Sequence, residues 1–441
     1  MKSDRDYRPI ILFIAIILII LFVGLFTPIQ GKISFRIETL KNKLYALSNP
    51  PEEAVFVPQE IKPLETTIVP IELTSTPVAP VLVMIATQTP IIQPTATPTA
   101  LPTATAIPLP VRANITGIKY EDQHGIWNYC APTNLSMALT FWGWDGNRIK
   151  AGDWLKPFDK DKNVMLYEMQ EFVAEETNLR SLVRSGGTAD LLKKMISAGF
   201  PVLIEKGSYM QEVSGAYSWM GHYNVVSGYD DEKQIWIVQD SYYERNYEIS
   251  YETLASEWRS FNFDFMIVYP GDKEAELYQL LGQYTNDDWA NQNAFAMADE
   301  QVAAAEDDES RFFAYFNRGT SQISLNDFFG AAQSYDMAFS FYANLEPKTR
   351  PYRIVWYQTG PYFAYYYSNR YQDVISLADI TLASTNEPFL EESYYWRALA
   401  RVALGEYENA QNDVRSCLEV HPGFPSCTAL AAKIGMEDSG S

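Results

Sequence analysis

The stretch Asn128-Tyr-Cys-Ala-Pro-Thr-Asn134 holds the residue from which the fold can be read, Cys130. It runs directly into Leu-Ser-Met-Ala-Leu at 135–139, whose apolar spacing is typical of a helix. A thiol at the start of a helix lies near the positive end of the helix dipole, which favours the thiolate, the nucleophilic form. The stretch therefore predicts a reactive cysteine at the beginning of a helix.

Two β-rich runs downstream supply a histidine and a carboxylate. His222 begins the run 222–229, Asp240 ends the run 235–240, and the polar residues 230–234 between them predict a hairpin. With the turn centred near 231–232, Asp240 falls opposite residues 222–224, where paired Cβ atoms are about 5 Å apart. A thiol, an imidazole and a carboxylate are the groups that thiol-mediated acyl transfer requires.

Together with Gln123, these segments resemble the papain-fold, bacteriocin-processing-like cysteine peptidases, a family that includes exported bacterial proteins. The resemblance spans residues 117–269, about a third of the chain. It rests on Gln123, on Tyr-Cys-Ala-Pro-Thr at 129–133 with residues 135–139, on Phe-Pro-Val-Leu-Ile at 200–204, on Gly-His-Tyr at 221–223 with residues 225–226 and 228–230, and on Asp240. It implies an α+β, papain-like peptidase domain at 113–272.

The resemblance also implies a role for each matching residue. Cys130 would be the nucleophile, His222 would take and return its proton, and Asp240 would orient the imidazole. Gln123 would stabilise the oxyanion together with the backbone amide of Cys130. The sequence departs from many relatives at Ala131, where they have glycine; we expect little consequence, because alanine accepts helical dihedral angles.

Plainer interpretations stand beside these roles. A single cysteine is often a small buried hydrophobe, and a strand histidine or a strand-end aspartate often serves only the fold. His124, next to Gln123, is an alternative oxyanion donor. Asn134, one helical turn after Cys130, is expected to make a structural polar contact.

The N-terminus predicts a membrane anchor. Residues 10–26 are apolar and uncharged, and they approach the roughly 20 residues that cross a bilayer. Lys2, Arg5 and Arg8 precede the run, so residues 1–30 are expected to be a cytoplasmic N-terminus and transmembrane helix of a single-pass cell-membrane protein, with the later domains extracytoplasmic. The alternative is a cleaved signal peptide, although no small-x-small site follows the run.

Residues 31–112 are expected to be a juxtamembrane segment, helical near 32–47, and a Pro/Thr-rich linker that forms an extended stalk. From residue 284 to 436 the pattern is helical and repetitive. The clearest unit contains Tyr394, Ala398, Gly405, Tyr407, Ala410, Cys417 and Pro422. Its spacing resembles the tetratricopeptide repeat, which implies an all-α region that binds a protein partner; an ordinary helical bundle is the alternative.

Composition excludes several other classes. A net charge of −21 argues against nucleic acid as a partner. Three histidines and three cysteines form no zinc motif, and no Gly-rich phosphate loop is present, so we expect no metal and no cofactor. Cys417 and Cys427 are either bridged or simply buried, and His421 is expected to be a helix-end residue.

These observations favour an anchored, extracytoplasmic cysteine peptidase-like protein that hydrolyses a peptide or amide bond. A surface-binding or scaffold protein that has lost catalysis is the alternative from another class. Acyl transfer to an amine instead of water is a third.

Overall fold

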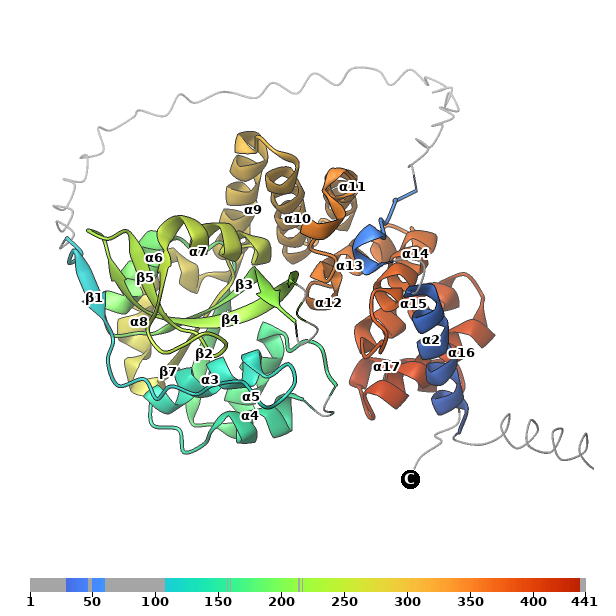
Figure 1. Ribbon diagram of the computed structural model, residues 1–441, viewed down its shortest axis with the longest axis horizontal. Helices are drawn as coiled ribbons and strands as arrows, with labels where there is room; N and C mark the ends of the chain where they lie inside the picture. The colour runs from blue at the N-terminus through green and yellow to red at the C-terminus, as the bar shows by residue number, and fades with distance from the viewer. Residues whose placement is uncertain are drawn as a thin grey trace, which may run out of the picture. The chain divides into compact units, whose positions relative to one another are not determined.

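The computed structural model describes residues 29–46, 50–59, 108–156, 158, 160–212, 215 and 217–436. The predicted membrane span at 10–26 and most of the predicted Pro/Thr stalk lie outside these residues. Within the described ranges, no helix has the length and apolar character needed to cross a bilayer. The helices and strands before residue 58 and after residue 109 belong to one compact unit (Figure 1).

Seven strands form one sheet, and each pair of neighbours is antiparallel. The order is β2-β7-β3-β4-β5-β6, with β1 also paired to β4. The strands are β1 (Arg112–Asn114), β2 (Leu179–Arg184), β3 (Val202–Gln211), β4 (Tyr217–Asp230), β5 (Ile235–Gln239), β6 (Tyr247–Ser250) and β7 (Phe265–Pro270). Long β3 and β4 form the centre of this sheet.

Helices cover both faces of the sheet (Figure 1). Leu203 and Met266 pack with α3 (Cys130–Phe141), α4 (Arg148–Leu155) and α5 (Leu166–Glu176). Their neighbours Ile204 and Phe265 point to the opposite face and share a core with α6 (Ala189–Ser197), α7 (Tyr251–Trp258) and α8 (Glu274–Leu281). This alternation is the period of two of a β-strand. The predicted mixture of helices and sheet is confirmed for this part of the chain.

The predicted hairpin is formed by β4 and β5. Val225 pairs with Gln239, so Asp240 follows at the level of Asn224, within the predicted register. The carboxylate of Asp230 accepts hydrogen bonds from the amides of Glu232 and Lys233, which closes the turn. The polar turn at 230–234, which the sequence shows locally, therefore places the end of β5 beside the middle of β4.

Residues after 286 are helical, as predicted. The helices are α9 (Asp287–Ala304), α10 (Asp308–Ser324), α11 (Phe328–Asn344), α12 (Ile354–Tyr357), α13 (Gly360–Tyr367), α14 (Tyr371–Ala383), α15 (Glu391–Ala403), α16 (Tyr407–Val420) and α17 (Pro425–Lys433). We refer to α9–α17 as the helical region.

Three helix pairs in this region share one kind of turn. Asn326, Asn369 and Gly405 each have positive φ, and each stands two positions before the aromatic residue that begins the second helix of its pair. Positive φ suits glycine and asparagine, which explains these residue types. The pairing is regular, and its assignment to the tetratricopeptide repeat stays a prediction.

Helix α2 (Ile29–Ala46) corresponds to the helix predicted near 32–47 and packs against α14 and α16. The side-chain amide of Asn42 donates to the carbonyl of Leu382 at 2.7 Å. The ring of Phe35 meets Phe389 edge-on, with centroids 5.0 Å apart. The segment expected to lie beside the membrane is thus integrated with the helical region.

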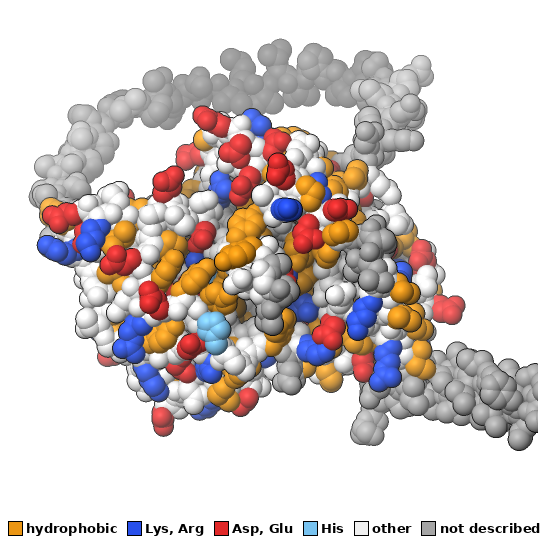
Figure 2. All heavy atoms as spheres, viewed as in Figure 1, with side chains coloured by type: hydrophobic (Ala, Val, Ile, Leu, Met, Phe, Trp, Pro, Cys, Tyr) orange, Lys and Arg blue, Asp and Glu red, His pale blue; other side chains and the backbone are white. Residues whose placement is uncertain are grey.

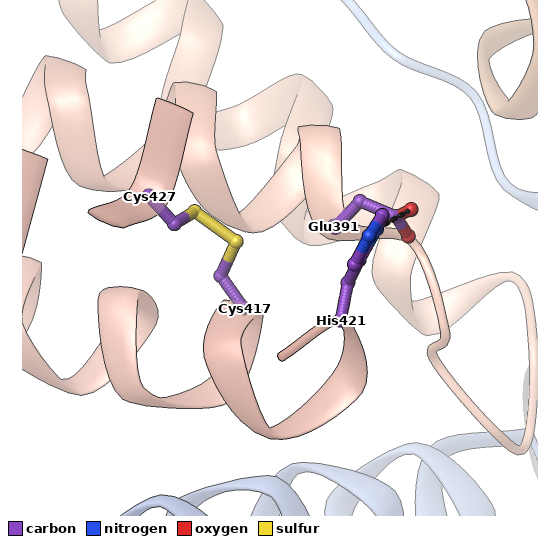
Figure 3. Close-up of a disulfide and its surroundings, with 4 residues drawn as sticks. All are labelled: Glu391, Cys417, His421 and Cys427. Atoms are coloured by element: carbon purple, nitrogen blue, oxygen red, sulfur yellow. Dashed lines mark hydrogen bonds and ion pairs between the residues drawn. A yellow bond between two sulfur atoms is a disulfide. The ribbon is translucent and has the colours of Figure 1, made fainter. Parts of the chain in front are cut away.

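Cys417 and Cys427 form a disulfide that joins α16 to α17 (Figure 3). His421, which follows α16, shares a hydrogen bond with the carboxylate of Glu391 at the start of α15, with Nδ1 and Oε1 2.9 Å apart. Of the two arrangements left open by the sequence, the bridge is the one formed. His421 lies at a helix end, as expected.

The sheet part and the helical region share a hydrophobic core. Trp219 of β4 stacks on Phe261, with centroids 5.9 Å apart, and Phe312 and Phe313 of α10 belong to the same buried cluster. On the face seen in Figure 2, acidic side chains are widely spread and basic ones lie between them.

Candidate active site

Cys130 is the first residue of α3 and is partly exposed. The ring of the preceding Tyr129 is buried against α4, where a Cβ on Gly152 would lie 1.8 Å from the Tyr129 hydroxyl. Only glycine leaves room for this ring. Because the first amides of a helix have no intrahelical acceptor, the Cys130 backbone N–H points to the same end of α3 as the sulfur and favours negative charge there.

His222 connects the thiol to a carboxylate. Its Nε2 lies 2.9 Å from Oδ1 of Asp240, and both side chains are buried. Burial lowers the pKa of His222, but the charge and hydrogen bond of Asp240 and the hydrogen bond with Cys130 outweigh burial and raise this pKa to about 9. With Nε2 on Asp240, Nδ1 is the ring nitrogen left for the sulfur.

Asp240 is held in place and kept ionised. Its Oδ1 accepts hydrogen bonds from the amides of Tyr242 at 2.9 Å and Tyr243 at 3.1 Å. Burial alone would raise the pKa of this carboxyl, but His222 and then Lys206 act in the other direction, and the net pKa is lowered. A negative charge is thus maintained behind the imidazole.

Gln123 is oriented by a small buried network. Its backbone amide donates to the carbonyl of Ser241 at 2.9 Å, and its Oε1 accepts from the Ser241 hydroxyl at 2.7 Å. Asn134 donates to the same hydroxyl and to the carbonyl of Cys130. The hydrogen bond from Ser241 fixes the side-chain amide of Gln123 so that its Nε2 remains available as a donor. Asn134 makes the structural polar contact that was predicted for it.

His124, the alternative donor, has a different environment. Its ring is exposed, and its Nδ1 lies 2.6 Å from the carboxylate of Asp122. Gln123 is therefore the better-anchored of the two.

Cys130, His222 and Gln123 line one cavity of about 1020 Å³. The other wall of the cavity comes from the helical region and from residues 50–52. The lining also includes Lys162, Asn163, Glu205, Glu212, Trp356, Tyr357 and Glu387. Trp127 also lines the cavity, whereas Trp142, Trp144 and Trp219 pack in the cores.

Several site residues were not predicted. Ser241 follows Asp240 directly, and its position in the network could have been suspected from that adjacency. Lys206 is buried in β3 opposite His222 and forms an ion pair with Glu257 at 2.7 Å. The wall supplied by the helical region has no local signal, because it depends on tertiary packing.

Within the described residues, no group of three or more His, Cys, Asp or Glu side chains is arranged to hold a metal ion. The groups gathered around Cys130 are those of a thiol nucleophile, a base with its orienting carboxylate, and amide donors.

Comparison with known proteins agrees with this chemistry. Residues 115–265 match the Peptidase C39 like family. The matched stretch covers about a third of the chain and contains most of the sheet with the helices that cover it, and the helical region follows it. Among curated proteins, none matches the chain.

One similar solved structure is a chain from Bacillus anthracis described as a C39-like peptidase. It is 14% identical, the alignment covers 36% of this chain and 96% of the other, and the TM-score is 0.29. A likeness at that score supports no conclusion about the fold or the function of this chain.

Proposed function

We propose that the chain is a cysteine peptidase-type hydrolase that cleaves a peptide or amide bond, with Cys130, His222, Asp240 and Gln123 as its catalytic groups. The observation that carries the proposal is the position of His222, hydrogen-bonded both to Asp240 and to the thiol of a helix-start cysteine that lines an open cavity. The family match over the same residues supports it.

In the proposed reaction the sulfur of Cys130 attacks the substrate carbonyl, and the thiol proton resides on His222. Negative charge develops on the carbonyl oxygen, where Nε2 of Gln123 and the backbone N–H of Cys130 donate to it. His222 then gives its proton to the departing amine, the carbon–nitrogen bond breaks and a thioester remains on Cys130. Water, deprotonated by His222, attacks this thioester, releases the acid and restores the thiol.

The proposal also includes the location of the protein in the cell and the binding partner of its helical region. The charge-free run at 10–26 supports an anchor in the cell membrane with the later domains outside the cytoplasm. The Cys417–Cys427 disulfide supports the same location, because disulfides persist in oxidising compartments. The helical region supports a role in holding a protein or peptide, as helix-pair arrays do.

The direct test is cleavage of a mixture of synthetic peptides by the full-length chain, followed by mass spectrometry. We expect new termini to appear with the unmodified protein and to be absent with Cys130→Ala and with His222→Ala. His421→Ala is the matched control and should cleave normally, because His421 follows α16 and does not line the cavity.

No cleavage by the unmodified chain would favour the binding or scaffold alternative, and cleavage that persists in Cys130→Ala would overturn the assignment of the nucleophile. An added amine that appears in the product would identify acyl transfer to nitrogen.

A further inference from the structure

The helical region closes one side of the cavity that contains Cys130. Trp356 and Tyr357 of α12 and residues 383–387 line it together with the peptidase-like residues. Tyr357 and Cys130 line the same cavity, and burial raises the pKa of Tyr357 against the opposing charge of Arg353. A substrate bound over Cys130 therefore contacts the helical region.

Lys162 lies in this cavity without a counter-ion. Its Nζ is 5.6 Å from the centroid of the Trp356 ring, and within the described residues it has no ion pair and no hydrogen bond. Three other buried basic side chains each have a carboxylate at 2.6–2.7 Å; the pairs are Lys206 with Glu257, Arg353 with Glu212, and Arg397 with Asp413. Two more, Lys156 and Arg350, donate to backbone carbonyls.

Within the described residues, the carboxylates near Lys162 form no ion pair with it. Glu387 pairs with Lys160 at 2.6 Å, and Glu212 pairs with Arg353. Asp161 is adjacent in sequence, but in the part of the chain that the structure describes no ion pair joins it to Lys162, and burial and the neighbouring carboxylates raise its pKa well above the usual range.

Lys162 itself remains mostly charged at neutral pH. Burial lowers its pKa to about 8, against the opposing attraction of Glu387. A partly buried ammonium group without a counter-ion is costly, and a carboxylate brought by a ligand would offset that cost.

The next residue, Asn163, is also polar. Its side chain is 8% exposed, and within the described residues its Oδ1 accepts no hydrogen bond. It lines the same cavity as Lys162 and Cys130. Because this oxygen is itself buried, it does not open into the cavity, and the subsite depends on Lys162 and Trp356.

We propose that Lys162, beside the Trp356 ring of the helical region, binds a carboxylate of the substrate, so that the enzyme selects peptides with an acidic side chain or a free C-terminus near the cleaved bond. This inference rests on the proposed function and names its substrate class. The recognising cation comes from the peptidase-like part and the ring beside it from the helical region, which makes the subsite a joint one.

The test measures binding separately from catalysis. The full-length Cys130→Ala protein is equilibrated with hexapeptide mixtures that carry Glu or Gln at one fixed position, and with mixtures that end in a free or amidated C-terminus. We expect one of these charged forms to be retained at least about tenfold more than its neutral isostere, as a charge-assisted hydrogen bond allows. The comparison of Glu with Gln tests an acidic side chain as the source of the carboxylate, and the comparison of free with amidated peptides tests the C-terminus.

In the Cys130→Ala background, the second substitution Lys162→Gln should abolish the preference for charged peptides, whereas Lys162→Arg should retain it. Lys150→Gln is the matched control, because Lys150 also lies over a tryptophan, Trp144, but outside the cavity. The comparison of charged and neutral peptides in Cys130→Ala does not depend on how the Lys162 variants fold.

Equal retention of charged and neutral forms, or no retention of either, would overturn the inference. So would a preference that survives Lys162→Gln in a protein with an unchanged melting temperature. If retained peptides are not cleaved when Cys130 is restored, the proposed hydrolysis fails while the carboxylate site stands.

Discussion

At the scale of single residues, the proposed chemistry depends on one imidazole shared by two partners. His222 is buried, and an isolated buried imidazole would be neutral. The carboxylate of Asp240 reverses that effect, so the pKa of His222 lies at about 9. The imidazolium form is thus retained near neutral pH beside the Cys130 sulfur.

Asp240→Asn should lower the pKa of His222, because it removes the charge that opposes burial. The expected result is a fall in the rate of peptide cleavage of about a hundredfold or more, the size of a general acid–base contribution. The alkaline limb of the pH profile should also move to lower pH. A pH-rate series on the variant checks this, and an unchanged limb would mean that Asp240 does not set the protonation of His222.

At the scale of elements, α4 supports the start of α3. Gly152 of α4 leaves the space that the Tyr129 ring occupies, and Tyr129 immediately precedes Cys130. Its carbonyl also accepts hydrogen bonds from the backbone and the hydroxyl of Thr133. The position of the sulfur is thus linked to packing between two helices.

Gly152→Ala should displace the Tyr129 ring, because the added methyl group would overlap its hydroxyl. We expect a loss of about 1–3 kcal/mol in the free energy of unfolding, as for overpacked cores, with slower alkylation of Cys130. Chemical denaturation and labelling kinetics measure the two effects. Asp153→Ala, at the following exposed position of α4, is the control for a changed helix residue without added volume in the core.

The disulfide between α16 and α17 is a second element-scale feature. Its cysteines belong to the same buried cluster as Trp356 but do not line the cavity. It closes a loop with a sequence separation of 10 residues, for which chain entropy gives about 2–3 kcal/mol. The paired change Cys417→Ser with Cys427→Ser should lower stability by that amount and leave the rate of Cys130 alkylation unchanged. A simultaneous loss of Cys130 reactivity would show that α17 supports the site.

The hairpin was predictable from the sequence because its signals are local. The polar turn at 230–234 sets the register of β4 and β5, and that register brings Asp240 beside His222. The helix start at Cys130 is equally local. The pairing of Lys162 with Trp356 is different: it joins two parts of the chain through packing, and no periodicity in either segment indicates it.

At the scale of the whole molecule, carboxyls of the peptidase-like part and of the helical region raise each other's pKa. Glu168 of α5 lies near Glu391 of α15. Burial raises the pKa of Glu168 to about 8. The hydrogen bond from the Met165 amide opposes this shift, and the charge of Glu391 adds to it. A carboxyl whose pKa is higher in the folded than in the unfolded state binds more protons when folded. Stability is therefore lost as pH rises from about 4.5 to about 8.

Glu168→Gln should remove part of this loss, because the amide is neutral and still offers an oxygen to the backbone N–H of Met165. We expect the free energy of unfolding of the variant to exceed that of the parent protein by about 1–3 kcal/mol at pH 8 and by little at pH 5. The control Glu175→Gln changes an exposed residue of the same helix. Its free energy of unfolding should equal that of the parent protein at both pH values. Unfolding curves at the two pH values provide the measurement, and an advantage that is equal at both would contradict the explanation.

The proposed chemistry requires that Cys130 be activated by His222. The most direct measurement is the rate at which iodoacetamide alkylates Cys130 across pH 5 to 10, in the unmodified chain and in His222→Ala. We predict rapid alkylation near neutral pH in the unmodified chain and a large loss of that rate in the variant. Identical pH profiles for the two proteins would contradict the activation of Cys130 by His222.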